Sequence, residues 1–177
     1  MKRIILVLAL MAFSCKDKPV ENKNIKSIEM DSYLTVVINA KVLENDKFEV
    51  YFSEDILNQY HVEDKIEKHV IGDTEFQDIS FQLPERIYPI KLRIDIGSSE
   101  VESPIEIRKI TLSTTAKSKS FEGPELNTFF KTNKFIEHEE SNNIYNRISI
   151  DGVYDPFMVT ININDIVTNL FNEDNVE

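Results

Sequence analysis

The sequence predicts an all-β protein, an antiparallel, jelly-roll-like β-sandwich of about seven to nine strands with one or two short helices. Apolar and polar residues alternate in several short segments, and alternation with a period of two is typical of half-buried strands. Glycine and proline residues fall mostly between these segments or at their ends. The length of 177 residues fits one domain, and the hydrophobic content of 41% is too high for a disordered chain.

The first predicted strand covers residues 34–42, where apolar side chains alternate along one face. A turn signal at 45–46 precedes a second alternating segment at 48–52. Because the connection is short, we expect these two strands to form an antiparallel hairpin. Residues 53–65 predict a loop with at most one helical turn, and residues 66–71 predict a short strand.

The middle of the chain predicts three further strands, at 76–83, 90–96 and 105–112. The first contains a one-residue slip in its apolar pattern, and the second alternates without interruption. In the third, the apolar phase changes at Arg108-Lys109. An extra residue there predicts a β-bulge, which returns all the isoleucine and leucine side chains of the strand to one face.

The last third of the chain contains shorter candidates. They are a short helix at 125–131, strands at 135–136 and 144–150, an alternating strand at 157–163 and a final helical turn at 164–170. The alternating apolar positions of the last strand are Phe157, Val159, Ile161 and Ile163. Asn164 or Asp165 is the expected cap of the final turn.

The amino terminus has the pattern of a secretory signal peptide over residues 1–14. Lys2 and Arg3 precede an apolar run at 4–13. This run is shorter than the ~20 apolar residues that a membrane-spanning helix needs. Cys15, the only cysteine of the chain, follows directly.

These residues resemble the start of a bacterial lipoprotein precursor, in which a small residue, here Ser14, precedes a cysteine. The resemblance implies cleavage before Cys15 and diacylation of its sulfur, which anchors a chain stably in a membrane. The charged stretch after Cys15 resembles the export signals of Bacteroidota lipoproteins, which implies the outer membrane, at its surface or its periplasmic face. The alternative is a signal peptide that is cut nearby and leaves Cys15 as a free thiol.

The rest of the chain divides by composition into three parts. Residues 15–30 are polar and lack periodicity, so they predict a flexible tether. Residues 31–171 contain all the predicted strands and form the sandwich domain, and residues 172–177 are an acidic tail. No internal repeat or second domain boundary is visible in the sequence.

Four segments resemble the galactose-binding-like, jelly-roll modules that are attached to bacterial envelope and polysaccharide proteins. The segments are 48–52, 76–84, 92–97 and 105–112. The resemblance implies a non-catalytic sandwich, and such modules often bind glycans. It transfers no ligand residue, because the matching positions are mainly core positions.

Composition and spacing exclude several functions. The formal net charge is −11, and a strongly acidic chain repels phosphate backbones, so we expect no nucleic-acid partner. One cysteine forms no internal disulfide and no multi-cysteine metal site. His61 and His69 lack the spacing of ligands on one helix or one strand, so no cofactor is expected apart from a structural calcium ion.

Two small sets of residues are candidates for ligand contacts. Tyr51, Tyr88 and Tyr154 are candidates for glycan binding, because an aromatic face packs on sugar C–H groups while polar groups fix the hydroxyls. Exposed tyrosines are also common on strands without any ligand. Asp151 and Asp155 offer carboxylate oxygens for calcium, or else belong to a solvated acidic loop.

The leading hypothesis is therefore a lipid-anchored, non-catalytic protein of a bacterial cell envelope that binds a glycan or an envelope protein. The alternative is an accessory lipoprotein subunit of a larger membrane assembly, and the third hypothesis is a small hydrolase. A binding module predicts a concave patch of aromatic and polar side chains, whereas a subunit predicts an exposed apolar patch. A hydrolase predicts carboxylates that converge in a cleft.

Overall fold

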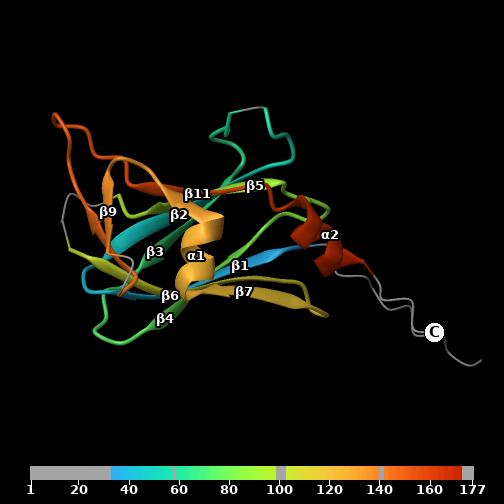
Figure 1. Cartoon of the computed structure of the whole chain (residues 1–177), viewed down its shortest axis with the longest axis horizontal. Helices are drawn as coiled ribbons and strands as arrows, with labels where there is room; N and C mark the ends of the chain where they lie inside the picture. Colours follow the sequence, from blue (N-terminus) through green and yellow to red (C-terminus); the bar gives the residue numbers. More distant parts are fainter. Residues whose placement is uncertain (1–32, 58, 99–102, 140–141, 173–177) are drawn as a thin grey trace, which may run out of the picture.

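The computed structural model describes residues 33–57, 59–98, 103–139 and 142–172. The signal peptide at 1–14, Cys15, the tether at 15–30 and nearly all of the acidic tail lie outside these ranges. Within them, the chain forms two antiparallel sheets with one hydrophobic core between them (Figure 1). The predicted β-sandwich is therefore confirmed.

The larger sheet has six strands in the order β4-β1-β6-β10-β9, and β7 pairs with β6 beside this path. Its strands are β1 (Thr35–Val42), β4 (Gln77–Gln82), β6 (Ile105–Ser113), β7 (Ser118–Glu122), β9 (Ile136–Glu139) and β10 (Ile144–Arg147). Every pairing in this sheet is antiparallel.

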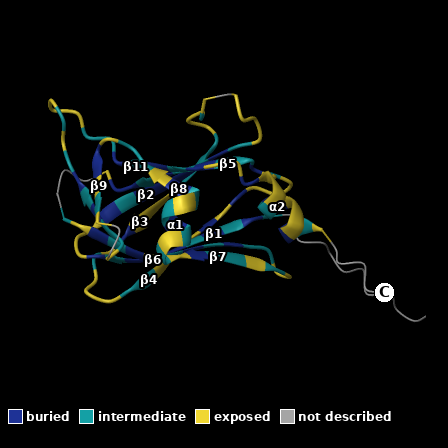
Figure 2. Cartoon of the chain, viewed as in Figure 1, coloured by how far each residue is buried: buried dark blue, intermediate teal, exposed yellow. Residues whose placement is uncertain are grey.

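The smaller sheet has five strands in the order β3-β2-β5-β11-β8. Its strands are β2 (Asp46–Ser53), β3 (Lys65–Val70), β5 (Lys91–Ile96), β8 (Phe130–Thr132) and β11 (Phe157–Thr160). The helix α1 (Gly123–Phe129) contacts β6 and β7 of the larger sheet and β8 of the smaller one, so it bridges the sheets. The helix α2 (Asn164–Phe171) contacts β7. Figure 2 shows that buried residues lie between the sheets and that exposed residues gather in the loops.

The predicted hairpin of the first two strands is wrong, because β1 and β2 belong to different sheets. β1 pairs with β4 and β6, whereas β2 pairs with β3 and β5. Both strands bury an apolar face in the same core, and the exposed residues 43–45 carry the chain from one sheet to the other. The short connection therefore joins strands of the two facing sheets and does not form a hairpin within one sheet.

The predicted bulge in β6 is confirmed. The register with β1 shifts between Asn39, which lies opposite Lys109, and Ala40, which lies opposite Ile107. Arg108 is the extra residue in this ladder. As a result, the apolar side chains on both sides of the bulge lie in the core, namely Ile105, Ile107, Ile110 and Leu112.

The apolar alternation at 157–163 predicted the wrong face of β11. Met158 and Thr160 are buried, and Phe157 and Val159 lie on the outer face. Pairing with β5 decides which residues of β11 face the core, since it sets Met158 opposite the buried Ile94. The hydroxyl of Thr160 is satisfied in the core, where it accepts a hydrogen bond from the Leu92 N–H at 2.8 Å.

Both helices form close to the predicted places, but the first turn of α2 has a different supporting residue. α2 starts after Ile163, and the side chain of Asn162 accepts a hydrogen bond from the Asn164 N–H at 2.9 Å. Asn162 therefore supports the first turn in place of the predicted cap at Asn164 or Asp165. In the described part of the loop at 54–64 the chain forms no helical turn. No helix in the described ranges is long and apolar enough to span a membrane.

A buried ion pair joins the two sheets. The side chains of Asp46 in β2 and Arg147 in β10 contact each other, and each is 1% exposed. Arg147 also donates to the carbonyl oxygens of Ile96 and Ser103, and Asp46 accepts from the Ser98 N–H at 2.8 Å. The pair is stable in the interior because these hydrogen bonds satisfy both charged groups.

Candidate functional site

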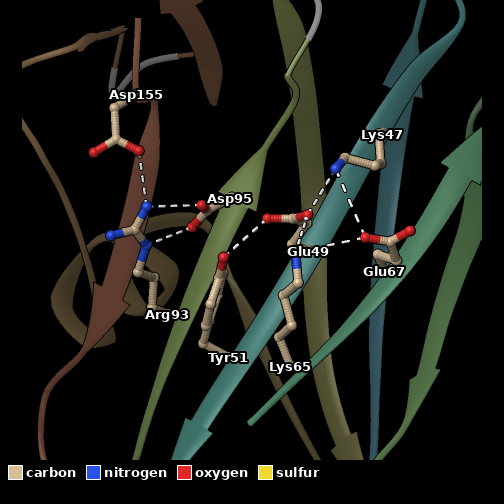
Figure 3. A network of polar contacts seen from close by, with 8 residues as sticks. All are labelled: Lys47, Glu49, Tyr51, Lys65, Glu67, Arg93, Asp95 and Asp155. Carbon is tan, nitrogen blue, oxygen red and sulfur yellow. Dashed lines mark hydrogen bonds and ion pairs between the residues drawn. The ribbon is translucent and has the colours of Figure 1, made fainter. Parts of the chain in front are cut away.

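A cluster of charged side chains covers the outer face of the smaller sheet (Figure 3). Alternation along β2 and β5 points their apolar side chains into the core and the intervening side chains outward. Strand pairing then sets the outward residues side by side: Tyr51 lies between Lys65 and Arg93, and Glu49 lies between Glu67 and Asp95. We call this set, with Lys47 and Asp155, the outer-face cluster.

Glu49 is the centre of the cluster. Its carboxylate lies 2.8 Å from Lys47 Nζ and 2.6 Å from Lys65 Nζ, and the Tyr51 hydroxyl donates to it at 3.1 Å. Burial alone raises the pKa of Glu49, but hydrogen bonds from Lys47, Lys65 and Tyr51 outweigh this effect and lower the pKa to about 2. Glu49 is therefore an ionised hydrogen-bond acceptor at every physiological pH.

Arg93 forms the second half of the cluster. Its guanidinium donates to Asp95 through Nε at 2.6 Å and Nη2 at 2.7 Å, and Nη2 also donates to Asp155 at 2.8 Å. The guanidinium carbon lies 3.8 Å from the ring centroid of Phe157, which explains why an apolar residue occupies the outer face of β11. Burial raises the pKa of Asp95, although Arg93 opposes this shift.

The cluster borders a hollow of about 270 Å³. The lining residues are Lys47, Glu49, Tyr51, Arg93, Asp95, Gly97, Ser98, Tyr154, Asp155 and Pro156. β2 and β5 form its floor, and the segment 154–156 just before β11 forms a wall. A second hollow of about 500 Å³ shares Lys47 and Ser98 with the first and extends past His69 and Ile71. The two hollows are therefore neighbours on either side of Lys47 and Ser98.

The structure brings together some of the residues that the sequence singled out. Tyr51, Tyr154 and Asp155 line the same hollow. Tyr88 does not line it, and its ring packs edge-on against Phe171 of α2 at a centroid distance of 4.8 Å. Asp151 lies at a tight turn with φ +52°, between the bridged residues Ile150 and Val153.

The calcium site at Asp151 and Asp155 stays a prediction. Asp155 accepts a hydrogen bond from Arg93, so its carboxylate already has a cationic partner. Among the residues that the structure describes, no group of three or more His, Cys, Asp or Glu side chains is placed to hold a metal ion.

Sequence reasoning missed the main polar residues of the hollow, which are Glu49, Arg93 and Asp95. The available signal was a polar residue, often charged, at every second position of β2, β3 and β5. That pattern predicts an outward face but leaves open which charged residues are neighbours, because the register comes from strand pairing.

The hollow has the chemistry of a site for polar ligands. It offers carboxylate acceptors and guanidinium and ammonium donors, two tyrosine side chains line it, and ion pairs hold the charged side chains in place. Comparison of the chain with protein-family models, with curated proteins and with solved structures finds no match in any of the three. The function is therefore inferred from the geometry of the outer face.

Proposed function

We propose that the protein is a lipid-anchored, non-catalytic binding module of a bacterial cell envelope, and that the hollow beside the outer-face cluster binds a neutral glycan. The observation that carries the proposal is the convergence of Tyr51 and Tyr154 with Glu49, Arg93 and Asp95 in one solvent-facing hollow. Such a concave set of aromatic and polar groups is what a small polar ligand needs.

The charges of the hollow favour a neutral ligand. Lys47 and Arg93 are balanced by Glu49, Asp95 and Asp155, so the lining carries no excess of positive charge that attracts a phosphate or a polyanion. Sugar hydroxyls both donate and accept hydrogen bonds, and this mixed lining offers partners of both kinds. Because ion pairs already order these side chains, a ligand loses little binding energy to their immobilisation.

One observation favours a hydrolase as the second candidate. Glu49 and Asp95 lie directly opposite each other on neighbouring strands, and their pKa values shift in opposite directions. A glycosidase uses a carboxylic acid and a carboxylate in this way. Against it, Asp95 forms a two-bond ion pair with Arg93, and protonation of Asp95 would break that pair. This pairing supports binding over catalysis.

A glycan array tests the proposal with the chain from residue 15 onward and Cys15 replaced by Ala. Binding to one class of neutral glycan is expected, with a loss of at least about tenfold in Tyr51→Ala and Tyr154→Ala, equal to ~1.4 kcal/mol. Tyr88→Ala is the matched control and keeps full affinity, because Tyr88 does not line the hollow.

Three results would count against the proposal. The array could show no binding, the control could lose as much affinity as the hollow variants, or the bound glycan could be cleaved. Release of reducing ends that stops in Asp95→Asn, with binding retained, would support the hydrolase instead.

A further inference from the structure

The loop at 54–64 exposes a group of large apolar side chains. Leu57 is 89% exposed, Val62 is 71% exposed and Ile56 is 53% exposed. In Figure 1 this loop projects from the sandwich beyond β2 and β5, and Figure 2 colours most of it as exposed. Single exposed apolar residues are ordinary, but three in one projecting loop make this loop a candidate contact surface.

Hydrogen bonds hold this loop in place. The Ser53 hydroxyl donates to the Asp55 carbonyl at 2.9 Å, and the Leu57 N–H donates to the Asp55 carboxylate at 2.8 Å. Lys91 Nζ donates to the Ile56 carbonyl at 3.1 Å and so ties the loop to β5. These bonds satisfy polar backbone groups near the tip, which leaves the apolar side chains to face outward.

The loop lies at the end of the sandwich where the described chain begins. The segment 83–90 links the two places: the Leu83 N–H donates to the Leu34 carbonyl at 2.8 Å, and the Ile90 N–H donates to the Ser53 carbonyl at 2.9 Å. Leu34 immediately precedes β1, and Ser53 immediately precedes the loop. The chain from Cys15 to Tyr33 spans at most about 65 Å even when fully extended.

We propose that this end of the sandwich docks on the lipid surface of the membrane that carries the anchor, with Ile56, Leu57 and Val62 in the interfacial region. The proposal rests on the lipid anchor of the proposed function. Because the anchor keeps the domain at a high effective concentration near the bilayer, a few apolar side chains suffice for docking. A zwitterionic surface is expected, since Glu54, Asp55, Glu63 and Asp64 flank the apolar side chains and repel anionic lipids.

Tryptophan fluorescence tests the docking, because the chain contains no tryptophan. The chain from Cys15 onward is coupled through its only thiol to a thiol-reactive lipid in phosphatidylethanolamine–phosphatidylcholine vesicles. Leu57→Trp and Val62→Trp are compared with Leu43→Trp, a matched exposed leucine beyond the other end of β1. Brominated lipids should quench the loop variants and shift their emission to shorter wavelength, and should leave Leu43→Trp unchanged.

Every other outcome overturns the proposal. Equal quenching of all variants means that no particular end faces the bilayer, and no quenching means that the loop stays in water. Protection of the loop variants only after envelope protein is added means that the loop docks on a protein.

The charge of the lipid gives a second expected result. Replacing part of the phosphatidylcholine by phosphatidylglycerol should weaken the quenching of the loop variants, because the flanking carboxylates repel anionic lipid.

The coupling through Cys15 is made in vitro, so this result does not depend on processing in the cell. The mass of Cys15 in the protein from cells tests the natural anchor separately. Failure of docking and failure of the proposed anchor are therefore distinguishable.

Discussion

Gly97 occupies the point where the buried ion pair of Asp46 and Arg147 joins the two sheets. Its φ of +115° lies in the region that favours glycine, and a Cβ atom at this position would lie 1.8 Å from Arg147 Nη1. Both the backbone and the neighbouring guanidinium therefore require a glycine here. In the sequence, Gly97 was visible only as the end of a strand.

Gly97→Ala should lower the free energy of unfolding by about 3 kcal/mol or more, because the added methyl group displaces a buried charged partner. Gly152→Ala is the control, with φ +76° but no heavy atom within 4 Å of the added Cβ. It should cost only the backbone strain of about 1–2 kcal/mol. Urea titrations followed by circular dichroism compare the two, and equal losses would contradict the steric explanation.

Glu49 makes stability depend on pH in the acidic range. Its pKa is about 2 in the folded protein, below the ordinary value of 4.5, because the hydrogen bonds from Lys47, Lys65 and Tyr51 outweigh the effect of burial. A lowered folded-state pKa stabilises the folded protein above the unfolded-state pKa, and this contribution is lost as the pH falls from about 4.5 towards 2. At neutral pH the contribution is on the order of 2 kcal/mol, allowing for screening of the partly exposed lysines.

Glu49→Gln should reduce the change in unfolding free energy between pH 4.5 and 2 by about 2 kcal/mol relative to the unmodified protein, because the contribution of the Glu49 carboxylate is removed. Glu67→Gln is the control from the same cluster, and its side chain is 50% exposed. It should change stability by less than about 1 kcal/mol at any pH. Unfolding curves at a series of pH values measure both, and identical pH dependence in Glu49→Gln and the unmodified protein would refute the assignment.

At the scale of elements, the period-two pattern located most strands but assigned one to the wrong face. Phe157 and Val159 are apolar for a local reason, since Phe157 stacks on Arg93 and Val159 lies opposite Arg93 in the outer row. β7 and β8 were missed because each buries a single phenylalanine, Phe121 and Phe130, which leaves no alternation to detect. Periodicity fails where a strand is short or where its outer face is also apolar.

Met158→Ala and Val159→Ala test the face of β11. Met158 is fully buried, so its truncation should cost about 2–5 kcal/mol of unfolding free energy through lost burial and a cavity. Val159 lies on the outer face, and its truncation should cost less than about 1 kcal/mol. Urea unfolding measures both values. A larger loss in Val159→Ala would restore the face that the alternation predicted.

At the scale of the whole molecule, the proposed lipid anchor depends on Cys15. Cys15→Ala should release the protein from membranes, because the acyl chains on its sulfur supply the proposed anchor. Fractionation of cells into membrane and soluble material measures the release, with Ser14→Ala as the control that keeps a small residue before the cysteine. Membrane retention of unlipidated Cys15→Ala would disprove the lipid anchor.

The sequence by itself determined the all-β class, the places of the long strands, the bulge at Arg108 and the short helices, because alternation, turn residues and phase slips are local properties of the chain. Only the tertiary structure decided that β1 and β2 lie in different sheets, that Asp46 meets Arg147, and that Tyr51 and Tyr154 line one hollow. These contacts join residues that are far apart in the chain. They depend on the register of strand pairs and on packing across the core, and neither of these produces a periodic pattern in the sequence.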